Sequence, residues 1–349
     1  KELLRRFPDS YKLNVYPSHR VVTWPDEILA ATKKNAETCT LVDRDNINDC
    51  ELGFPFPIPQ SGAEPIWNHR LKWRGENARR FNNQMIVQQN GSYQLTKLVE
   101  DVTFGYASIK RPRRIRDGSA EFLRYLSETL APPRLAGTFI LVHESSGTGA
   151  EGRNAWLYSP GLRRIRRAPT VCCDNHSAGT DGHQFYDQVD MYNGVLERFT
   201  WKLVGKREMY IPYNSNKIAG PSVKYADLAS PRHLNQDLPR YELHRVWVVD
   251  ATLKAGARYI NARRTFYVDE DSWRILIIDH YDGQGQMWRY SEAHTVNHYE
   301  MPAIFPTIEV HHDLKSGRYI AGLLDNEETA PDFSFQTSPA NYSPQNLRT

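Results

Sequence analysis

The sequence predicts a mainly β protein (α+β) built on a large antiparallel sheet, either a curved sheet wrapped around helices or a barrel with an apolar interior. The prediction rests on residues 241–324, where six short runs rich in β-branched and aromatic residues are each closed by a turn signal. Such short connections leave no room for a crossover helix, so neighbouring strands are expected to be antiparallel. The run Trp273–Ile278 carries apolar residues on both faces, which indicates a sheet with cover, or a ligand, on both sides in its middle.

The organisation along the chain is expected to be simple. We expect residues 1–325 to form a single domain and residues 326–349 to form an extended C-terminal tail. Residues 1–80 are predicted to be helical and irregular, and residues 81–325 to form the sheet. The sheet region is expected to include a helix and two long loops, at residues 119–130, 170–198 and 214–239. Loops of that length are unusual unless they are functional or cover another part of the protein.

Local signals predict individual elements. Pro25, followed by two acidic residues, opens a helix over residues 25–36, because proline and negative charge both favour the first helical turn. The segment AEPIWNHRLKWRG carries apolar residues at roughly helical spacing and predicts a short helix. Asn90-Gly91 lies between two strand-like runs and predicts a β-hairpin.

Composition and charge narrow the function classes. The chain has 349 residues, of which 40% are hydrophobic, and its formal net charge is +3. Nucleic acid is disfavoured as a partner because the charges are nearly balanced and no nucleic-acid-binding module is present. No run approaches the roughly 20 apolar residues that a membrane helix needs. Basic residues gather at 110–116 and 163–167, where we expect a solvated edge that resists pairing; contact with anionic lipid headgroups or an acidic partner is the alternative.

The four cysteines come in two pairs. Cys39 and Cys50 bracket a short polar loop with no nearby histidine, and we expect a disulfide between them. It would stabilise the fold by roughly 3 kcal/mol in the chain-entropy account and would indicate an oxidising compartment. Cys172 and Cys173 are adjacent, and a bond between them would strain the intervening peptide, so we expect two small buried thiols.

No arrangement predicts catalysis, and we expect no catalytic residue, no metal site and no cofactor. His294 and His298 share one face of a predicted strand, but strand residues four apart are too far separated to chelate one ion. The GxSxG pattern of a nucleophile elbow is missing. Asp181, Asp187 and Asp190 could suggest glycosidase carboxylates or a calcium site; as polar loop residues they are expected to cap their own backbone.

Many segments, in order, resemble a family of exported Gram-negative bacterial proteins of unknown function, DUF1329. The resemblance covers nearly the whole chain and is carried by GFPFPIPQSGAEPIWNHRLKWRG, LYSPGLRRIRRAP, DGHQFYDQVDMYNG, WKLVGKREMYIPYN and the run from LPRYELHRVWVVDATL to WRYSEAH. It implies the fold of the LolA/LolB lipoprotein carriers, an unclosed β-barrel whose mouth is plugged by helices. It also implies a periplasmic protein that works with an RND-type inner-membrane exporter and an outer-membrane partner. The chain begins at Lys1 without a signal peptide, and we treat it as a mature or trimmed form.

The function expected from pattern and resemblance is binding or carriage of a hydrophobic, lipid-like molecule. A non-enzymatic adaptor in an envelope transport complex is the alternative, and an enzyme acting on an apolar substrate is less favoured. The loop at 170–198 is expected near the mouth of the cavity. From the strand alternation, the expected apolar lining is Trp247, Val249, Phe266, Val268, Leu276, Ile278, Trp288 and Tyr290.

Overall fold

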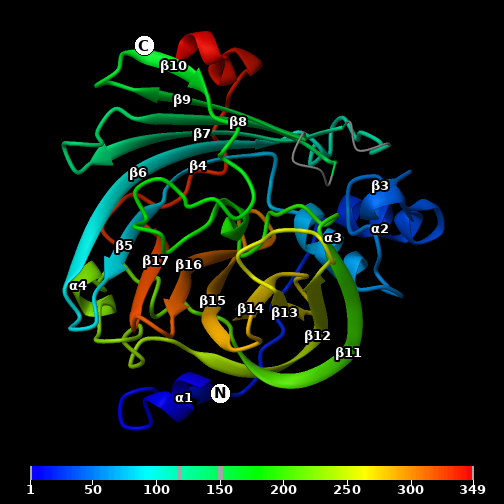
Figure 1. Ribbon diagram of the computed structural model, residues 1–349. Coiled ribbons are helices and arrows are strands. Elements are labelled where there is room, and N and C mark those ends of the chain that lie inside the picture. The colour runs from blue at the N-terminus through cyan, green and yellow to red at the C-terminus, as the bar shows by residue number, and fades with distance from the viewer. Residues whose placement is uncertain (1, 117–119, 148–151, 348–349) are drawn as a thin grey trace.

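One large sheet dominates the computed structural model, which describes residues 2–116, 120–147 and 152–347 (Figure 1). Fifteen strands form it, in the order β1-β12-β13-β14-β15-β16-β17-β5-β6-β7-β8-β9-β10, with β11 paired to β12 and β4 paired to β6. The pairs are antiparallel except β1 with β12, which run parallel, so the sheet is mixed. It curves strongly without closing, because β10 pairs only with β9 at its far end. The predicted mainly β, unclosed architecture is confirmed.

The C-terminal part of the chain builds one half of the sheet as a meander, as its turn signals predict. Its strands are β11 (Phe199–Pro212), β12 (Tyr241–Leu253), β13 (Arg263–Asp269), β14 (Ile275–Tyr281), β15 (Met287–His298), β16 (Ala303–Asp313) and β17 (Arg318–Leu324). The other half comprises β4 (Asn77–Phe81), β5 (Asn83–Val87), β6 (Tyr93–Phe104), β7 (Glu121–Ala131), β8 (Phe139–Ser145), β9 (Arg153–Ser159) and β10 (Arg164–Arg167). The pairing of β17 with β5 joins the halves, and β5–β6 is the hairpin predicted at Asn90-Gly91.

The helices lie mainly in the first quarter of the chain. They are α1 (Glu2–Arg6), α2 (Asp26–Thr38), α3 (Ala63–Leu71) and α4 (Tyr225–Leu228); the short strands β1 (Val15–Tyr16), β2 (Thr40–Val42) and β3 (Asn46–Asn48) lie near the first two. The predicted helix at 25–36 is confirmed as α2, with Pro25 at its N-cap. The helix predicted in AEPIWNHRLKWRG is confirmed as α3, every residue of which except Glu64 is buried. Within the described ranges, none of the helices has the length and apolar character needed to cross a membrane.

The helix expected at residues 119–130 is wrong. Residue 119 lies outside the described residues, and Glu121–Ala131 is strand β7, paired on both sides with β6 and β8. Its Leu, Glu and Arg residues have good intrinsic helix propensity, which misled the prediction. Propensity is a weak preference, and two full ladders of backbone hydrogen bonds override it.

The two faces of the sheet are covered by different parts of the chain, as the doubly apolar run indicated. On the β11–β14 half, the inner face packs on α3 in the largest core cluster, which includes Trp67, Phe199 and Phe266. On the outer face of β16, β17 and β5, the connection at 214–239 packs Ile218 and Leu228 against the strands. That loop is therefore cover for the sheet.

The C-terminal segment is packed, in contrast to the extended tail expected over 326–349. Tyr342 and Leu347 are buried against Leu141 on the outer face of β7–β9, and Asp332 bridges to Arg79 of β4. Residues 348–349 lie outside the described residues. The polar composition misled the prediction, because two apolar side chains in a polar segment are enough to attach it to an uncovered sheet face.

The cysteines form two disulfides. Cys39, at the C-cap of α2, is bonded to Cys50, as predicted. The expectation of two thiols at Cys172 and Cys173 is wrong, since these residues are bonded to each other. Cys173 adopts a left-handed backbone conformation (φ 62°), a sharp local turn that no residue pattern signalled.

Candidate functional site

A cavity lies between the inner face of β5–β9 and the segment 170–198, which runs inside the curve of the sheet (Figure 1). Its empty volume is about 1250 Å³, part of it open to solvent. β7 lines it with Leu123, Tyr125, Ser127 and Thr129, and the alternation follows from the period of two along a strand. The residues between them point to the outer face, where the C-terminal segment packs. The cavity therefore exists because residues 121–131 form a strand.

The apolar part of the lining comes from both walls. Leu98 and the β7 side chains lie on the sheet, together with Ile140 and Val142 of β8. The facing segment contributes Val171, Ala178, Tyr186 and Val189. The sequence analysis expects this segment near the mouth of a cavity, and in the structure it forms one wall of this cavity.

Segment 170–198 is attached to the rest of the molecule by ion pairs. Asp187, which is fully buried, accepts a hydrogen bond of 2.6 Å from Arg264 of β13 and one of 2.7 Å from Tyr259. Arg264 is also fully buried, and its guanidinium lies over the rings of Tyr192 and Phe199. An ionised pair is tolerated in a core only with such close partners.

Asp190 makes the second attachment. Its carboxylate accepts hydrogen bonds from Lys72 (2.5 Å), Arg74 and Arg274 (2.9 Å). Burial acts to raise the pKa of Asp190, but the charges of Lys72, Arg74 and Arg274 hold it well below its ordinary value. Asp190 and Met191 both have positive φ values, of 53° and 63°, and this turn directs the carboxylate toward the three cations.

The expectation that the loop acids cap their own backbone is wrong. Asp187 and Asp190 pair with buried cations, and Asp181 pairs with Arg318 at 2.6 Å. The cationic partners come from β13, from β17, from the residues just after α3 and from the residue just before β14, which are remote in sequence. Spacing alone carries no signal for pairs of this kind.

One end of the cavity is strongly charged. A second pocket, with an empty volume of about 680 Å³, shares Tyr125, Val189, Asp190 and other lining residues with the main cavity and so continues it. Four arginines line it, and we call them the basic end: Arg70, Arg74, Arg80 and Arg274. The only carboxylates among its described lining residues are Glu100 and Asp190.

Glu309 of β16 faces the main cavity but does not offset this positive charge. Burial, and then the neighbouring charge of Asp190, raises the pKa of Glu309 to about 8. Its carboxyl group is therefore largely protonated at neutral pH. The cavity thus joins an apolar wall to an end with an excess of positive charge.

The eight residues predicted as apolar lining lie elsewhere. Five of them share one face, because Trp247 pairs with Val268 and Phe266 pairs with both Val249 and Ile278. That face is packed on α3 and its neighbours, and none of the eight belongs to the lining of the cavity. Leu276 sits at a register shift, Trp288 lies near Phe185, and Tyr290 contacts the N-terminal cluster of Leu3 and Tyr11.

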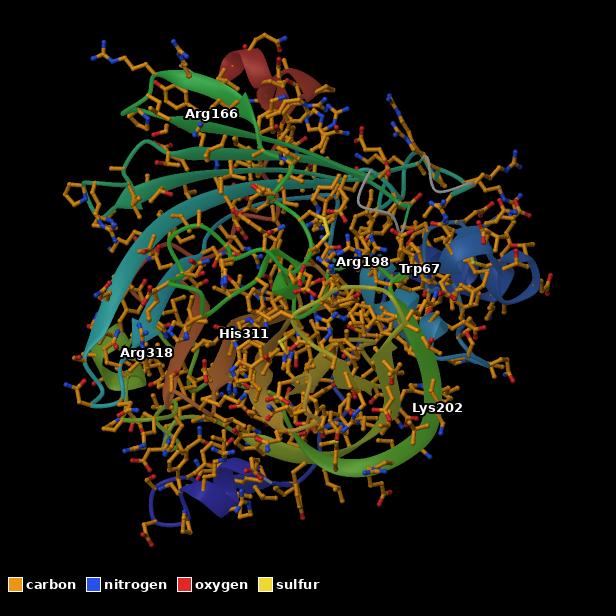
Figure 2. The ribbon with its side chains drawn as sticks, in the orientation of Figure 1. Trp67, Arg166, Arg198, Lys202, His311 and Arg318 are labelled. Atoms are coloured by element: carbon orange, nitrogen blue, oxygen red, sulfur yellow. A yellow bond between two sulfur atoms is a disulfide. The ribbon has the colours of Figure 1, made fainter. Side chains whose placement is uncertain are left out.

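The sequence pattern locates an apolar face on the β11–β14 half, whereas this cavity lies on the other half of the sheet. Because residues 119–130 are predicted as a helix, the alternation of Leu123, Tyr125, Ser127 and Thr129 carries no weight in the sequence analysis. Period-two alternation in this stretch is the signal that could have found it. The basic residues at 163–167 lie on and just before the end strand β10, where Figure 2 shows Arg166.

One cluster has the composition of a metal site but is already engaged. The ligand atoms of His244, Asp269 and Asp271 lie within 4.8 Å of one another. His244 is bonded to Glu242, Asp269 accepts hydrogen bonds from Tyr213 and Ser272, and Asp271 is paired with Arg20. These bonds explain the cluster as a structural network.

Comparison with known proteins relates the chain to a single family. Residues 1–348 match the family described as "Protein of unknown function (DUF1329)". The uncharacterized protein PA3922 of Pseudomonas aeruginosa is 45% identical over 348 residues, which cover 99% of this chain and 76% of that protein.

Solved structures show the same fold. A domain of Vibrio parahaemolyticus assigned to outer-membrane lipoprotein sorting is similar with a TM-score of 0.55 at 13% identity, over 82% of this chain and 98% of that one. A DUF1329 protein of Desulfovibrio piger is similar with a TM-score of 0.53 at 12% identity, over 78% and 92% of the two chains. The chain therefore belongs to the DUF1329 family and has the fold of the lipoprotein-sorting proteins.

Proposed function

We propose that this protein is a non-catalytic periplasmic carrier that holds a hydrophobic, lipid-like molecule between β5–β9 and segment 170–198. The observation that carries the proposal is the cavity with one apolar wall on the sheet and another on the segment. Mostly apolar walls with a few polar groups are typical of small-molecule sites. The fold of a lipoprotein-sorting domain supports the same class of ligand.

The compartment and partners belong to the proposal. Two disulfides suit an oxidising compartment such as the periplasm. An RND-type inner-membrane exporter and an outer-membrane protein are the partners that the family resemblance implies. Carriage between these partners would require the ligand to enter and leave the cavity while the protein stays folded. Segment 170–198 is the wall through which this would occur, because it is the wall that is not part of the sheet.

The experiment measures binding of an uncharged apolar probe, N-phenyl-1-naphthylamine, by its fluorescence, together with native mass spectrometry of the purified protein. Ile140→Trp enlarges a side chain of the cavity wall, and Phe139→Trp enlarges its neighbour, which belongs to the cluster on the opposite face. We expect the wild-type protein to bind the probe saturably. Ile140→Trp should raise the dissociation constant at least about tenfold, because filling the site removes contact area for the ligand. Phe139→Trp should change the dissociation constant by no more than about twofold. No saturable binding by the wild-type protein, and no copurified apolar molecule, would overturn the proposal in favour of an adaptor.

A further inference from the structure

The basic end of the cavity holds hydrogen-bond donors that the protein itself does not use. Arg70 and Arg274 are each only 3% exposed. Nε and Nη1 of Arg70, and Nη2 of Arg274, have no hydrogen-bond partner among the described residues. A buried charged donor without a partner loses its hydration without compensation, and native proteins rarely leave such a group unsatisfied.

Arg70 is the clearest case because its ion pair is weak. It reaches Glu144 at 3.4 Å, whereas Arg153 donates two hydrogen bonds to the same carboxylate, at 2.9 and 3.1 Å, and Asn193 donates a third. Those three bonds all reach Oε2 of Glu144, so the long contact of Arg70 with Oε1 uses only Nη2 of Arg70 and leaves its Nε and Nη1 without a partner. The guanidinium of Arg70 is held between the rings of Trp67 and Phe122, with centroid distances of 4.5 and 5.2 Å, which fixes its position beside the cavity.

Arg274 is held in place by its other two nitrogens. Its Nε donates to the backbone oxygen of Ile304 at 2.5 Å and its Nη1 donates to Asp190 at 2.9 Å. Its Nη2 is therefore the nitrogen without a hydrogen-bond partner. Burial lowers the pKa of Arg274 to about 10, and the group is still charged at neutral pH. Four arginines and two carboxylates line this end, so the net charge of its described lining residues is +2.

We propose that the basic end binds the anionic head group of an amphipathic molecule, through carboxylate or phosphate oxygens, while the molecule's apolar chain lies along the β7–β8 wall. The inference rests on the proposed function and assigns the class of its ligand. Guanidinium groups match carboxylate and phosphate oxygens geometrically, and such bonds are strong where water is excluded. The shared lining of the two pockets gives the chain and the head group one continuous site.

The test compares two fluorescent probes that differ only in the head group, cis-parinaric acid and its methyl ester. The wild-type protein is expected to bind the acid at least about tenfold more tightly, the effect of one charge-assisted hydrogen bond. In Arg70→Met the ratio of acid to ester affinity is expected to fall toward one. Arg124→Met removes the same charge from β7, where Arg124 pairs with Glu121, and is expected to keep the wild-type ratio.

The outcomes separate the two proposals. If neither probe binds, the carrier function itself fails. If both bind with equal affinity, or if Arg70→Met keeps the preference for the acid, the carrier function stands and the anionic head group is refuted. The third measurement is the binding of inorganic phosphate alone. The amphipathic ligand would be overturned if the protein bound phosphate tightly, if Ile140→Trp left that binding unchanged, and if the wild-type protein did not prefer the acid probe to the ester. That result would mean a site for a free anion.

Discussion

Substitution of Asp190 by asparagine tests how segment 170–198 is held over the cavity. The carboxylate bonds to Lys72, Arg74 and Arg274, and its loss leaves three buried cations without their counter-charge. Two unit charges about 4 Å apart interact by about 4 kcal/mol at an effective dielectric constant of 20. Removal of one partner from a buried pair costs about 3–5 kcal/mol, because the remaining charge stays desolvated. We expect Asp190→Asn to lower the free energy of unfolding by about 3–5 kcal/mol at pH 7.

The assay is urea unfolding followed by tryptophan fluorescence at several pH values. Because the folded-state pKa of Asp190 is depressed, its contribution is fully present above the unfolded value of about 4 and is lost as pH falls through the folded value. The difference between wild type and Asp190→Asn should therefore shrink in acid. Asp181→Asn is the matched control, since Asp181 lies in the same segment but is 66% exposed, and it should cost about 1 kcal/mol or less. Equal stability of wild type and Asp190→Asn at pH 7 would refute the reasoning.

Two further predictions concern Glu309 on the inner face of the sheet and Gly62 at the start of α3. In the folded protein the pKa of Glu309 is about 8, whereas in the unfolded chain it is about 4.3. Between these two pH values the folded state binds the extra proton, so the free energy of unfolding falls as pH rises. Wild type should lose up to about 4 kcal/mol relative to Glu309→Gln between pH 5 and pH 8 in urea unfolding; parallel pH profiles would contradict this. A Cβ at Gly62 would lie 2.6 Å from backbone atoms of β11, so Gly62→Ala should lower the melting temperature by several degrees. Gly283→Ala, where a Cβ meets nothing within 4 Å, is the control and should leave it nearly unchanged.

The meander over 241–324 could be predicted because each strand carries its own local signal. Alternating apolar residues bounded by tight turns leave few alternatives to antiparallel pairing, and the observed registers of β12–β17 follow from it. The run Trp273–Ile278 correctly indicated cover on both faces, and Pro25 and Asn90-Gly91 correctly placed a helix start and a hairpin.

The cavity could not be placed in the same way, because its walls depend on neighbours remote in sequence. β7 is a strand only because β6 and β8 flank it, and five of the eight apolar residues expected to face a ligand lie on a face that packs on α3 and its neighbours instead. An apolar face has the same pattern whether a ligand or the protein's own side chains fill it.

The sequence by itself determined the fold class, the family, the Cys39–Cys50 disulfide and the doubly covered sheet, since these follow from local propensity, spacing and resemblance. Only the tertiary structure decided where the cavity lies and which charges surround it. Asp190, Arg70 and Arg274 come from segments separated by tens of residues, and each is an ordinary polar residue in its local context. Burial and convergence turn them into a charged site, because both the interaction between charges and the cost of an unpartnered donor increase when water is excluded.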